Sequence, residues 1–220
     1  MFALLAAAVA AAAPPPDPRG AKIAAAYELV GAGKVQESLD AIEPVIADFE
    51  KENARRKERV YCGMSATQTL AYMLMAASEK KSAVALGPEF CGALYLKSFV
   101  LIELKRVPEA QSTLRYLLTF APNHARYWIE LGQSYAVQAD WPKMLQACTT
   151  AEASTDMADP DLVKREKGAA WRCMGYALIE QAKWDEAAAL YNKCVALDPN
   201  DAKAQHELRY IAEMRKKPKT

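Results

Sequence analysis

The spacing of apolar residues between positions 168 and 201 predicts two short helices. Trp171, Met174 and Leu178 recur at the interval that places side chains on one face of a helix. A second set with helical spacing follows at Ala187, Leu190, Tyr191 and Cys194. A turn predicted at residues 182–185 makes the two helices an antiparallel hairpin. Pro199 ends this hairpin, because a proline holds the preceding residue outside the helical region.

Small residues in this hairpin predict a close contact between its helices. Gly175 and Ala187 lie on opposite sides of the predicted turn, so we expect them to face each other and to let the two backbones approach. Tyr176 follows Gly175 directly, which rotates its side chain by about 100° on an ideal helix. We therefore expect Gly175 to stabilise the hairpin and Tyr176 to face away from it.

The same arrangement of residues recurs upstream. Trp128 precedes Trp171 by 43 positions, and each is followed 13 positions later by a second tryptophan, Trp141 or Trp184. Contiguous units of 34 residues can be laid over this part of the chain at 91–124 and 125–158, and 168–201 has the same length.

A 34-residue period with the opening Trp-x-x-Leu-Gly-x-x-Tyr, found at residues 128–135, resembles the tetratricopeptide repeat family. The resemblance implies an all-α fold, namely a right-handed superhelical solenoid of antiparallel helix pairs. It departs from the family pattern at Leu94 and Ser98, which replace the tryptophan and the glycine of the first unit. Residues 202–216 are expected to form the solvating end helix that repeat arrays require, before a basic tail at 217–220.

The remaining segments fit the repeat less well. Residues 21–52 are interpreted as a degenerate helix pair, residues 53–90 as a divergent helical insert, and residues 159–167 as a longer second helix or an Asp-Pro-Asp loop. Glu52 and Arg56 have the spacing of an ion pair on a helix. No useful length of the chain alternates apolar and polar residues with period two, so the sequence predicts no β-sheet.

Residues 1–13 are apolar and are followed by three prolines. They are too few to span a bilayer, which needs about 20 residues, but they fit the apolar region of a secretory signal with small residues at its end. No basic side chain precedes them, so a wrongly assigned start or a disordered Ala-Pro tail is the alternative. We expect cleavage near Pro14, a linker at 14–20, and a periplasmic or secreted protein that does not insert into the bilayer, with a cytoplasmic location as the alternative.

Composition and motifs disfavour several classes of function. The net charge of +1 disfavours nucleic acid as a partner, because phosphate binding requires a basic surplus. The chain lacks the glycine-rich phosphate loops, the Gly-x-Ser-x-Gly turn and the His-Glu-x-x-His pair of common enzymes. His124 and His206 have no cysteine or carboxylate at ligand spacing, so we predict no catalytic site, metal or cofactor.

The five cysteines form no Cys-x-x-Cys pair, and burial as small apolar residues is their expected role. An oxidising compartment would permit disulfides and leave one thiol over. Cys173 and Cys194 lie almost symmetrically about the hairpin turn, so they could pair if their helix faces agree.

The resemblance implies a concave groove lined mainly by the first helix of each unit. Matching positions give these candidate partner-binding residues: Tyr95, Phe99, Ile102, Arg126, Ile129, Gln133, Arg172, Tyr176, Ile179, His206 and Tyr210. Such side chains anchor peptides, and we expect a third of them, including Ile129 and Ile179, to be buried. The sequence thus predicts a non-enzymatic module that binds a protein or peptide segment in the bacterial cell envelope. An accessory subunit of an enzyme or transport complex and a cytosolic scaffold are the alternatives.

Overall fold

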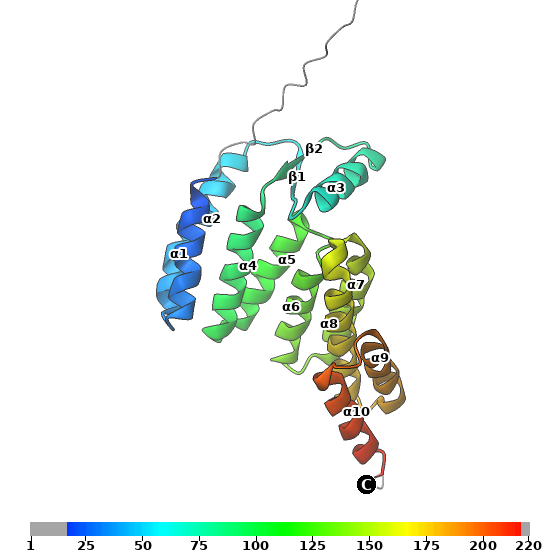
Figure 1. The fold of residues 1–220 in the computed structure, drawn as a ribbon. Coiled ribbons are helices and arrows are strands. Elements are labelled where there is room, and N and C mark those ends of the chain that lie inside the picture. The colour runs from blue at the N-terminus through cyan, green and yellow to red at the C-terminus, as the bar shows by residue number, and fades with distance from the viewer. Residues whose placement is uncertain (1–16, 217–220) are drawn as a thin grey trace, which may run out of the picture.

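A computed structural model describes residues 17–216 of the chain (Figure 1). These residues form ten α-helices, a 3-10 turn at Thr155–Met157 and two short strands. The elements follow the order α1 (Arg19–Gly31), α2 (Val35–Asn53), β1 (Arg59–Cys62), α3 (Ala66–Ser78), β2 (Ala83–Leu86), α4 (Pro88–Glu103), α5 (Val107–Phe120), α6 (Ala125–Ala136), α7 (Trp141–Ser154), α8 (Pro160–Ile179), α9 (Trp184–Leu197) and α10 (Ala202–Met214). The predicted signal at 1–13, residues 14–16 of the predicted linker and the basic tail at 217–220 lie outside the described residues. The predicted linker is too long at its C-terminal end, because α1 already begins at Arg19.

The helices form a right-handed solenoid of antiparallel pairs, which confirms the predicted fold class (Figure 1). The pairs are α1–α2, α4–α5, α6–α7 and α8–α9, and α10 packs on the last of them. Each turn within a pair contains one residue with a positive φ, namely Gly33, Lys105, Ala139 and Ala182. The backbone amide of each donates to the carbonyl three residues earlier, so the four turns share one construction.

Helix α8 is longer than the sequence analysis predicted. It begins at Pro160, so the extension at 159–167 lengthens the first helix of the third unit. The predicted longer second helix or loop is wrong, because α7 already ends at Ser154. Proline is favourable at the first position of a helix, where its missing amide has no partner to lose.

Residues 59–86 contain a small sheet, so the prediction of no β-sheet is wrong. Strands β1 and β2 are parallel, with Arg59 opposite Ala83 and Cys62 opposite Leu86, and α3 connects them. Each strand has four residues, too few to show an alternating pattern. Two neighbouring residues of β1, Tyr61 and Cys62, are both buried, which removes the alternation altogether.

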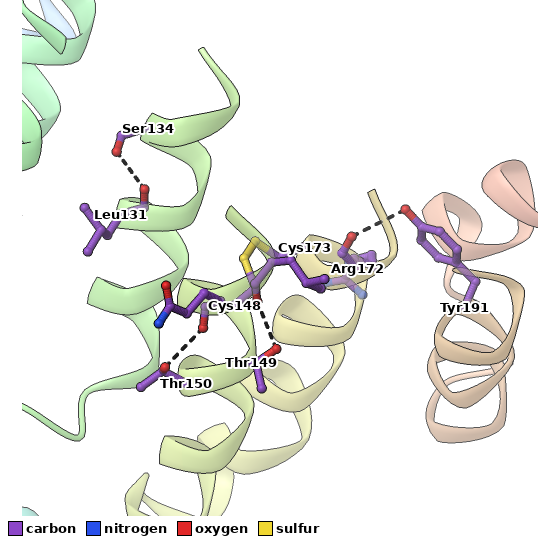
Figure 2. Close-up of a disulfide and its surroundings, with 10 residues drawn as sticks. Leu131, Ser134, Cys148, Thr149, Thr150, Arg172, Cys173 and Tyr191 are labelled. Atoms are coloured by element: carbon purple, nitrogen blue, oxygen red, sulfur yellow. Dashed lines mark hydrogen bonds between the residues drawn. A yellow bond between two sulfur atoms is a disulfide. The ribbon is translucent and has the colours of Figure 1, made fainter. Parts of the chain in front are cut away.

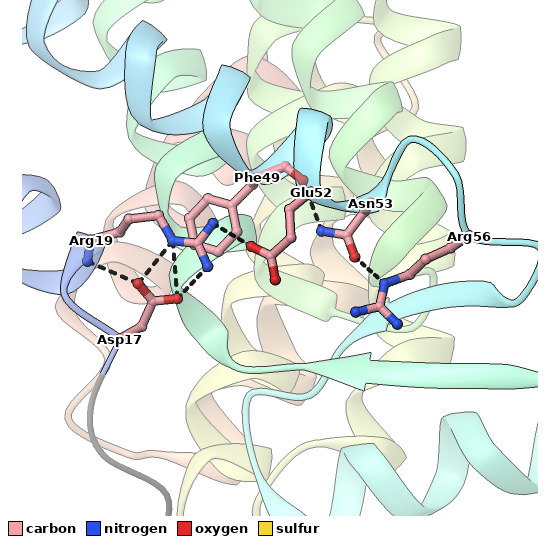
Figure 3. Close-up of polar contacts among 6 residues, drawn as sticks. All are labelled: Asp17, Arg19, Phe49, Glu52, Asn53 and Arg56. Carbon is pink, nitrogen blue, oxygen red and sulfur yellow. Dashed lines mark hydrogen bonds and ion pairs between the residues drawn. The ribbon is translucent and has the colours of Figure 1, made fainter.

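The first helix pair is joined by contacts around Arg19 (Figure 3). The guanidinium of Arg19 lies 3.4 Å from the centre of the Phe49 ring and donates to Glu52 at 2.8 Å and to Asp17. The predicted Glu52–Arg56 pair does not form in the described structure, because Arg56 donates to Asn53 instead. Glu52 therefore connects α2 to the start of α1.

The core follows the order of the chain. One cluster of buried residues joins α1, α2, α4, α5 and α6, a second joins α6, α7 and α8, and a third joins α8, α9 and α10. Each pair thus contacts mainly its neighbours, as in a repeat array. None of the helices described between residues 17 and 216 has the length and apolar character needed to cross a membrane.

Two disulfides connect successive elements. Cys62 of β1 is bonded to Cys91 of α4, and Cys148 of α7 to Cys173 of α8 (Figure 2). The considered Cys173–Cys194 pair is wrong, because Cys173 lies on the side of α8 that faces the preceding helix pair. Cys194 remains a buried thiol and donates to the carbonyl of Gly168 at 3.6 Å.

The α8–α9 hairpin differs in one contact from the prediction. A Cβ atom added at Gly175 would lie 2.7 Å from Cε2 of Tyr191, so Tyr191 and not Ala187 is the side chain closest to this glycine. The end of the hairpin agrees with the prediction. Asp198, which precedes Pro199, is extended, and α9 ends at Leu197.

Candidate peptide-binding groove

The first helices of successive units, α6 and α8, together with α10, enclose a groove with a volume of about 450 Å³. Five of the predicted residues line it: Arg126, Ile129, Gln133, Arg172 and Tyr176. Those of α6 follow one another at intervals of three and four residues, and those of α8 at an interval of four, so each set lies on one face of its helix. We call this cavity the α6–α8–α10 groove.

The other six predicted residues lie outside the lining of this groove. Ile179 is buried, with 6% of its surface exposed, and Ile102 packs against the core. Phe99 and Tyr210 are exposed to 38% and 39%, and His206 is also exposed. Tyr95 lies beside the groove, because its hydroxyl donates to Glu130 at 3.0 Å.

The wall formed by α6 combines an ion pair with a buried phenol. Arg126 donates to Glu130 at 2.8 Å, and the same carboxylate oxygen accepts the hydrogen bond from Tyr95. Burial raises the pKa of Tyr95 to about 12, and the Glu130 carboxylate adds to the rise. The phenol therefore stays protonated and keeps Glu130 oriented between α4 and α6.

The wall formed by α8 and α10 is held by Asp201. The side chain of Asp201 pairs with Arg172 and also accepts a hydrogen bond from the amide of Ala204, which caps α10. This cap places Lys203 and Glu207 of α10 opposite α6. Lys203 forms no ion pair within residues 17–216, so its ammonium group is available to a ligand.

Tyr176 provides the aromatic surface of the groove. Its ring meets the Trp141 ring edge-to-face with centres 5.9 Å apart, and 40% of its surface is exposed. Partial burial raises the pKa of Tyr176, and the carboxylates of Glu180 and Glu207 add to this effect. The tyrosine is thus a fixed and partly exposed ring, which suits the role of an anchor.

The floor of the groove is apolar and contains the second disulfide (Figure 2). Ile129, Met144 and Cys173 line it. A Cβ atom added at Gly132 would lie 2.6 Å from the sulfur of Cys148 and 3.3 Å from that of Cys173. The glycine of the Trp-x-x-Leu-Gly motif therefore makes room for the disulfide between α6, α7 and α8.

The sequence analysis missed eight lining residues, namely Glu130, Ala136, Met144, Ala169, Cys173, Tyr191, Lys203 and Glu207. Glu130 lies four residues from Arg126, a spacing that could have identified it. The α10 residues follow Asp201, whose capping role was readable from its position before the predicted end helix. Met144 comes from a second helix, which the predicted groove did not include.

A second cavity of about 560 Å³ adjoins the groove at Arg172 and Lys203, which line both. It lies between the start of α8 and the segment that joins α9 to α10. Both signs of charge line it, with Lys164 and Arg165 on one side and Asp198 and Asp201 on the other. This cavity extends the polar rim of the α6–α8–α10 groove.

Comparison with known proteins supports the repeat assignment. The family model described as "Tetratricopeptide repeat" matches residues 168–201. A search of curated proteins by sequence found no match.

Solved structures show where else the fold occurs. The nearly identical TPR-like repeats of a Podosopora anserina protein assigned as a kinesin light chain align with a TM-score of 0.61 and 14% identity, over 90% of this chain and 86% of that chain. MamA from Desulfovibrio magneticus RS-1 aligns with a TM-score of 0.57 and 16% identity, over 91% and 86% of the two chains. The first TPR of Spaghetti (RPAP3), bound to the HSP90 peptide SRMEEVD, aligns with a TM-score of 0.50 and 20% identity, over 58% of this chain and 94% of that chain.

These similarities concern the fold, whereas the family match concerns one unit. Residues 168–201, which comprise the C-terminal part of α8, all of α9 and the segment before α10, match the sequence of the repeat. The neighbouring helix pairs share its geometry. The chain therefore contains a tetratricopeptide repeat at residues 168–201 and has the fold of a tetratricopeptide solenoid.

Proposed function

We propose that this protein is a non-enzymatic adaptor that binds a segment of a partner protein in the α6–α8–α10 groove. The observation that carries the proposal is the composition of that groove. It combines an apolar floor, the partly exposed ring of Tyr176 and the polar side chains of Gln133 and Lys203. The repeat of Spaghetti (RPAP3), which is bound to an HSP90 peptide, supports the use of such a fold for peptides.

The geometry favours a partner segment of mixed character. Ile129 and Met144 are each only 3% exposed and close the floor, so the partly exposed ring of Tyr176 offers the apolar contact, while Gln133 and Lys203 offer hydrogen bonds at the rim. The two arginines of the groove are already paired with Glu130 and Asp201, so little of their positive charge is available to a ligand. We infer a segment with an apolar or aromatic anchor and flanking polar groups, at least one of them an acceptor for Lys203.

A photo-crosslinking experiment with a matched control tests the proposal. A photoreactive phenylalanine analogue replaces Tyr176 in one variant and Tyr116 in another, because both tyrosines are exposed to 40% but Tyr116 belongs to α5, outside the groove. A partner bound in the groove should give a crosslinked adduct from position 176 and none from position 116. The same adduct from both positions, or an adduct from position 116 alone, would contradict the proposal.

Substitution of Tyr176 by alanine separates binding from stability. The side chain is partly exposed and makes one edge-to-face contact, so its loss should lower the free energy of unfolding by no more than about 1 kcal/mol. Affinity for the captured partner should fall at least tenfold, because aromatic anchors dominate such interfaces. Thermal unfolding and titration with the partner segment measure the two effects. Unchanged affinity in a folded variant would show that the partner binds outside the groove.

We further propose that the protein acts in the cell envelope after export. The apolar segment at 1–13 and the two disulfides support this location, because structural disulfides persist in oxidising compartments. Mass spectrometry of the envelope fraction should find a chain that begins near Pro14. Protein that retains residues 1–13, with all five cysteines reduced, would favour a cytosolic scaffold instead.

A further inference from the structure

Helix α3 presents an apolar face that no described residue covers. Its inner side is formed by Gln68, Tyr72 and Ala76, which are buried. The opposite side holds Leu70 and Leu74, one turn apart and each exposed to 61%. Among the helices described between residues 17 and 216, α3 is the one without a charged residue. A solvent-facing helix of a repeat array ordinarily carries charges, so this exposed apolar face indicates an interaction surface.

Basic residues gather beside this face. Because β1 and β2 are parallel and Arg59 lies opposite Ala83, the segments that lead into the two strands lie together at the C-terminal end of α3. Residues 54–59 and 79–81 contain six basic and two acidic side chains, namely Arg55, Arg56, Lys57, Arg59, Lys80 and Lys81 against Glu58 and Glu79. The rest of the chain has 22 basic and 25 acidic residues. The two segments thus carry a net charge of +4, whereas the rest of the chain carries −3.

Most of these cations are not neutralised by the protein. Glu79 accepts from Arg59 at 3.1 Å and from Lys81 at 2.8 Å, which ties the two basic segments together. Arg55, Arg56, Lys57 and Lys80 form no ion pair with the residues that the structure describes. They remain available to an anionic surface next to Leu74.

We propose that this end of the molecule docks on the surface of an anionic lipid bilayer, with Leu70 and Leu74 in the interface and the basic segments among the headgroups. An exposed apolar helix face flanked by lysine and arginine is the combination that binds such interfaces without crossing them. A second copy of the chain fits less well, because a symmetric contact through α3 would bring two positive clusters together. The attachment is peripheral, so it requires no membrane-spanning helix.

The fold holds α3 in a fixed orientation for this contact. The Tyr61 and Tyr72 rings stack with centres 4.9 Å apart and join α3 to β1. The Cys62–Cys91 disulfide then joins β1 to α4 of the array. Figure 1 shows α3 at the upper edge of the helix array and α10 at the bottom of the view, so a membrane-docked molecule would leave the α6–α8–α10 groove open.

Vesicle binding of the full chain tests the proposal. Cosedimentation with vesicles of phosphatidylglycerol and phosphatidylcholine should detect binding that weakens as salt is raised and that is lost on phosphatidylcholine alone. Leu70→Ser with Leu74→Ser should weaken binding about a hundredfold, from the apolar surface that each leucine exposes. Lys57→Gln with Lys80→Gln should weaken it about thirtyfold, since each cation near an anionic surface contributes about a factor of five.

A matched variant controls for the loss of any exposed apolar side chain. Val137 is also exposed to 61% but lies between α6 and α7, so Val137→Ser should leave vesicle binding unchanged. Residues 1–13 are common to all the variants, so their own affinity for lipid cancels in the comparison. Equal binding by the leucine variant and the original chain would overturn the proposal. The proposal would also be overturned if the original chain did not bind vesicles but formed a dimer that the leucine substitutions dissociate.

Discussion

The contact between Gly175 and Tyr191 gives a stability prediction that the structure makes quantitative. A Cβ atom at position 175 would lie 2.7 Å and 2.9 Å from two ring atoms of Tyr191, against an ordinary contact distance of about 3.4 to 4 Å. The ring is 2% exposed and cannot move into solvent without displacing its neighbours. Gly175→Ala should therefore overpack the α8–α9 interface, which costs about 1 to 3 kcal/mol.

The higher helix propensity of alanine offsets part of the overpacking cost of Gly175→Ala. The same substitution at a second glycine, Gly92, measures this propensity effect alone. Gly92 lies inside α4, and a Cβ atom there would meet nothing within 4 Å. Gly92→Ala should stabilise the protein by about 0.5 to 1 kcal/mol, because glycine loses more backbone entropy in a helix than alanine does. Gly175→Ala should destabilise it by a net amount of about 1 to 2 kcal/mol. The corresponding fall in Tm is roughly 2 to 8 °C for a chain of this size.

Urea and thermal unfolding, followed by circular dichroism at 222 nm, measure both variants. A double variant assigns the cost to the ring: with Tyr191→Leu in place, Gly175→Ala should cost less than it does alone. If Gly175→Ala raised Tm as Gly92→Ala does, the close approach of α8 to the Tyr191 ring would be refuted.

Two further predictions concern the disulfide below the groove and the partly buried side chain of His124. Replacing Cys148 and Cys173 by alanine should lower the free energy of unfolding by about 3 kcal/mol, because their bridge closes a loop with a sequence separation of 25 residues; an unchanged Tm would contradict it. Burial lowers the pKa of His124 to about 4, so below the unfolded value near 6.5 the unfolded chain binds a proton that the folded chain does not. Stability should therefore fall as the pH drops from 6.5 towards 4, by at most about 1.4 kcal/mol per pH unit, and His124→Phe should reduce this slope in melting curves.

The repeat itself was predictable from the sequence because its signals are local. Trp128 and Trp171 occupy equivalent positions in α6 and α8, and Pro199 ends α9 through its effect on the residue before it. Even the degenerate first pair is folded by the same turn as the others, with Gly33 at the position of positive φ. Positions matched to the repeat family also placed Arg126, Gln133 and Tyr176 on one concave surface, although binding by them stays a prediction.

Contacts between helices were less predictable, because distance along a hairpin does not fix the direction of a side chain. Cys173 and Cys194 are nearly symmetric about the turn, yet Cys173 points to Cys148 of the preceding pair. Gly175 likewise meets Tyr191 and not Ala187. One residue of offset turns a helix side chain by about 100°, so an error of a single position selects a different partner.

The structure of the insert at residues 53–90 could not be predicted from the sequence for a different reason. Its two strands are short, and they pair across 24 residues, so neither a local pattern nor a repeat period indicates them. The array does not depend on it for continuity, since α2 packs directly on α4, with the Phe49 and Phe90 rings 5.2 Å apart. A segment that leaves the stacking of its neighbours intact is free to carry a surface of its own. The uncharged face of α3 and the basic residues beside it are the surface that we propose for this role. Figure 1 shows α3 at the upper edge of the array and α10 at the bottom, so substitutions that weaken the proposed membrane attachment should leave the proposed peptide binding unchanged.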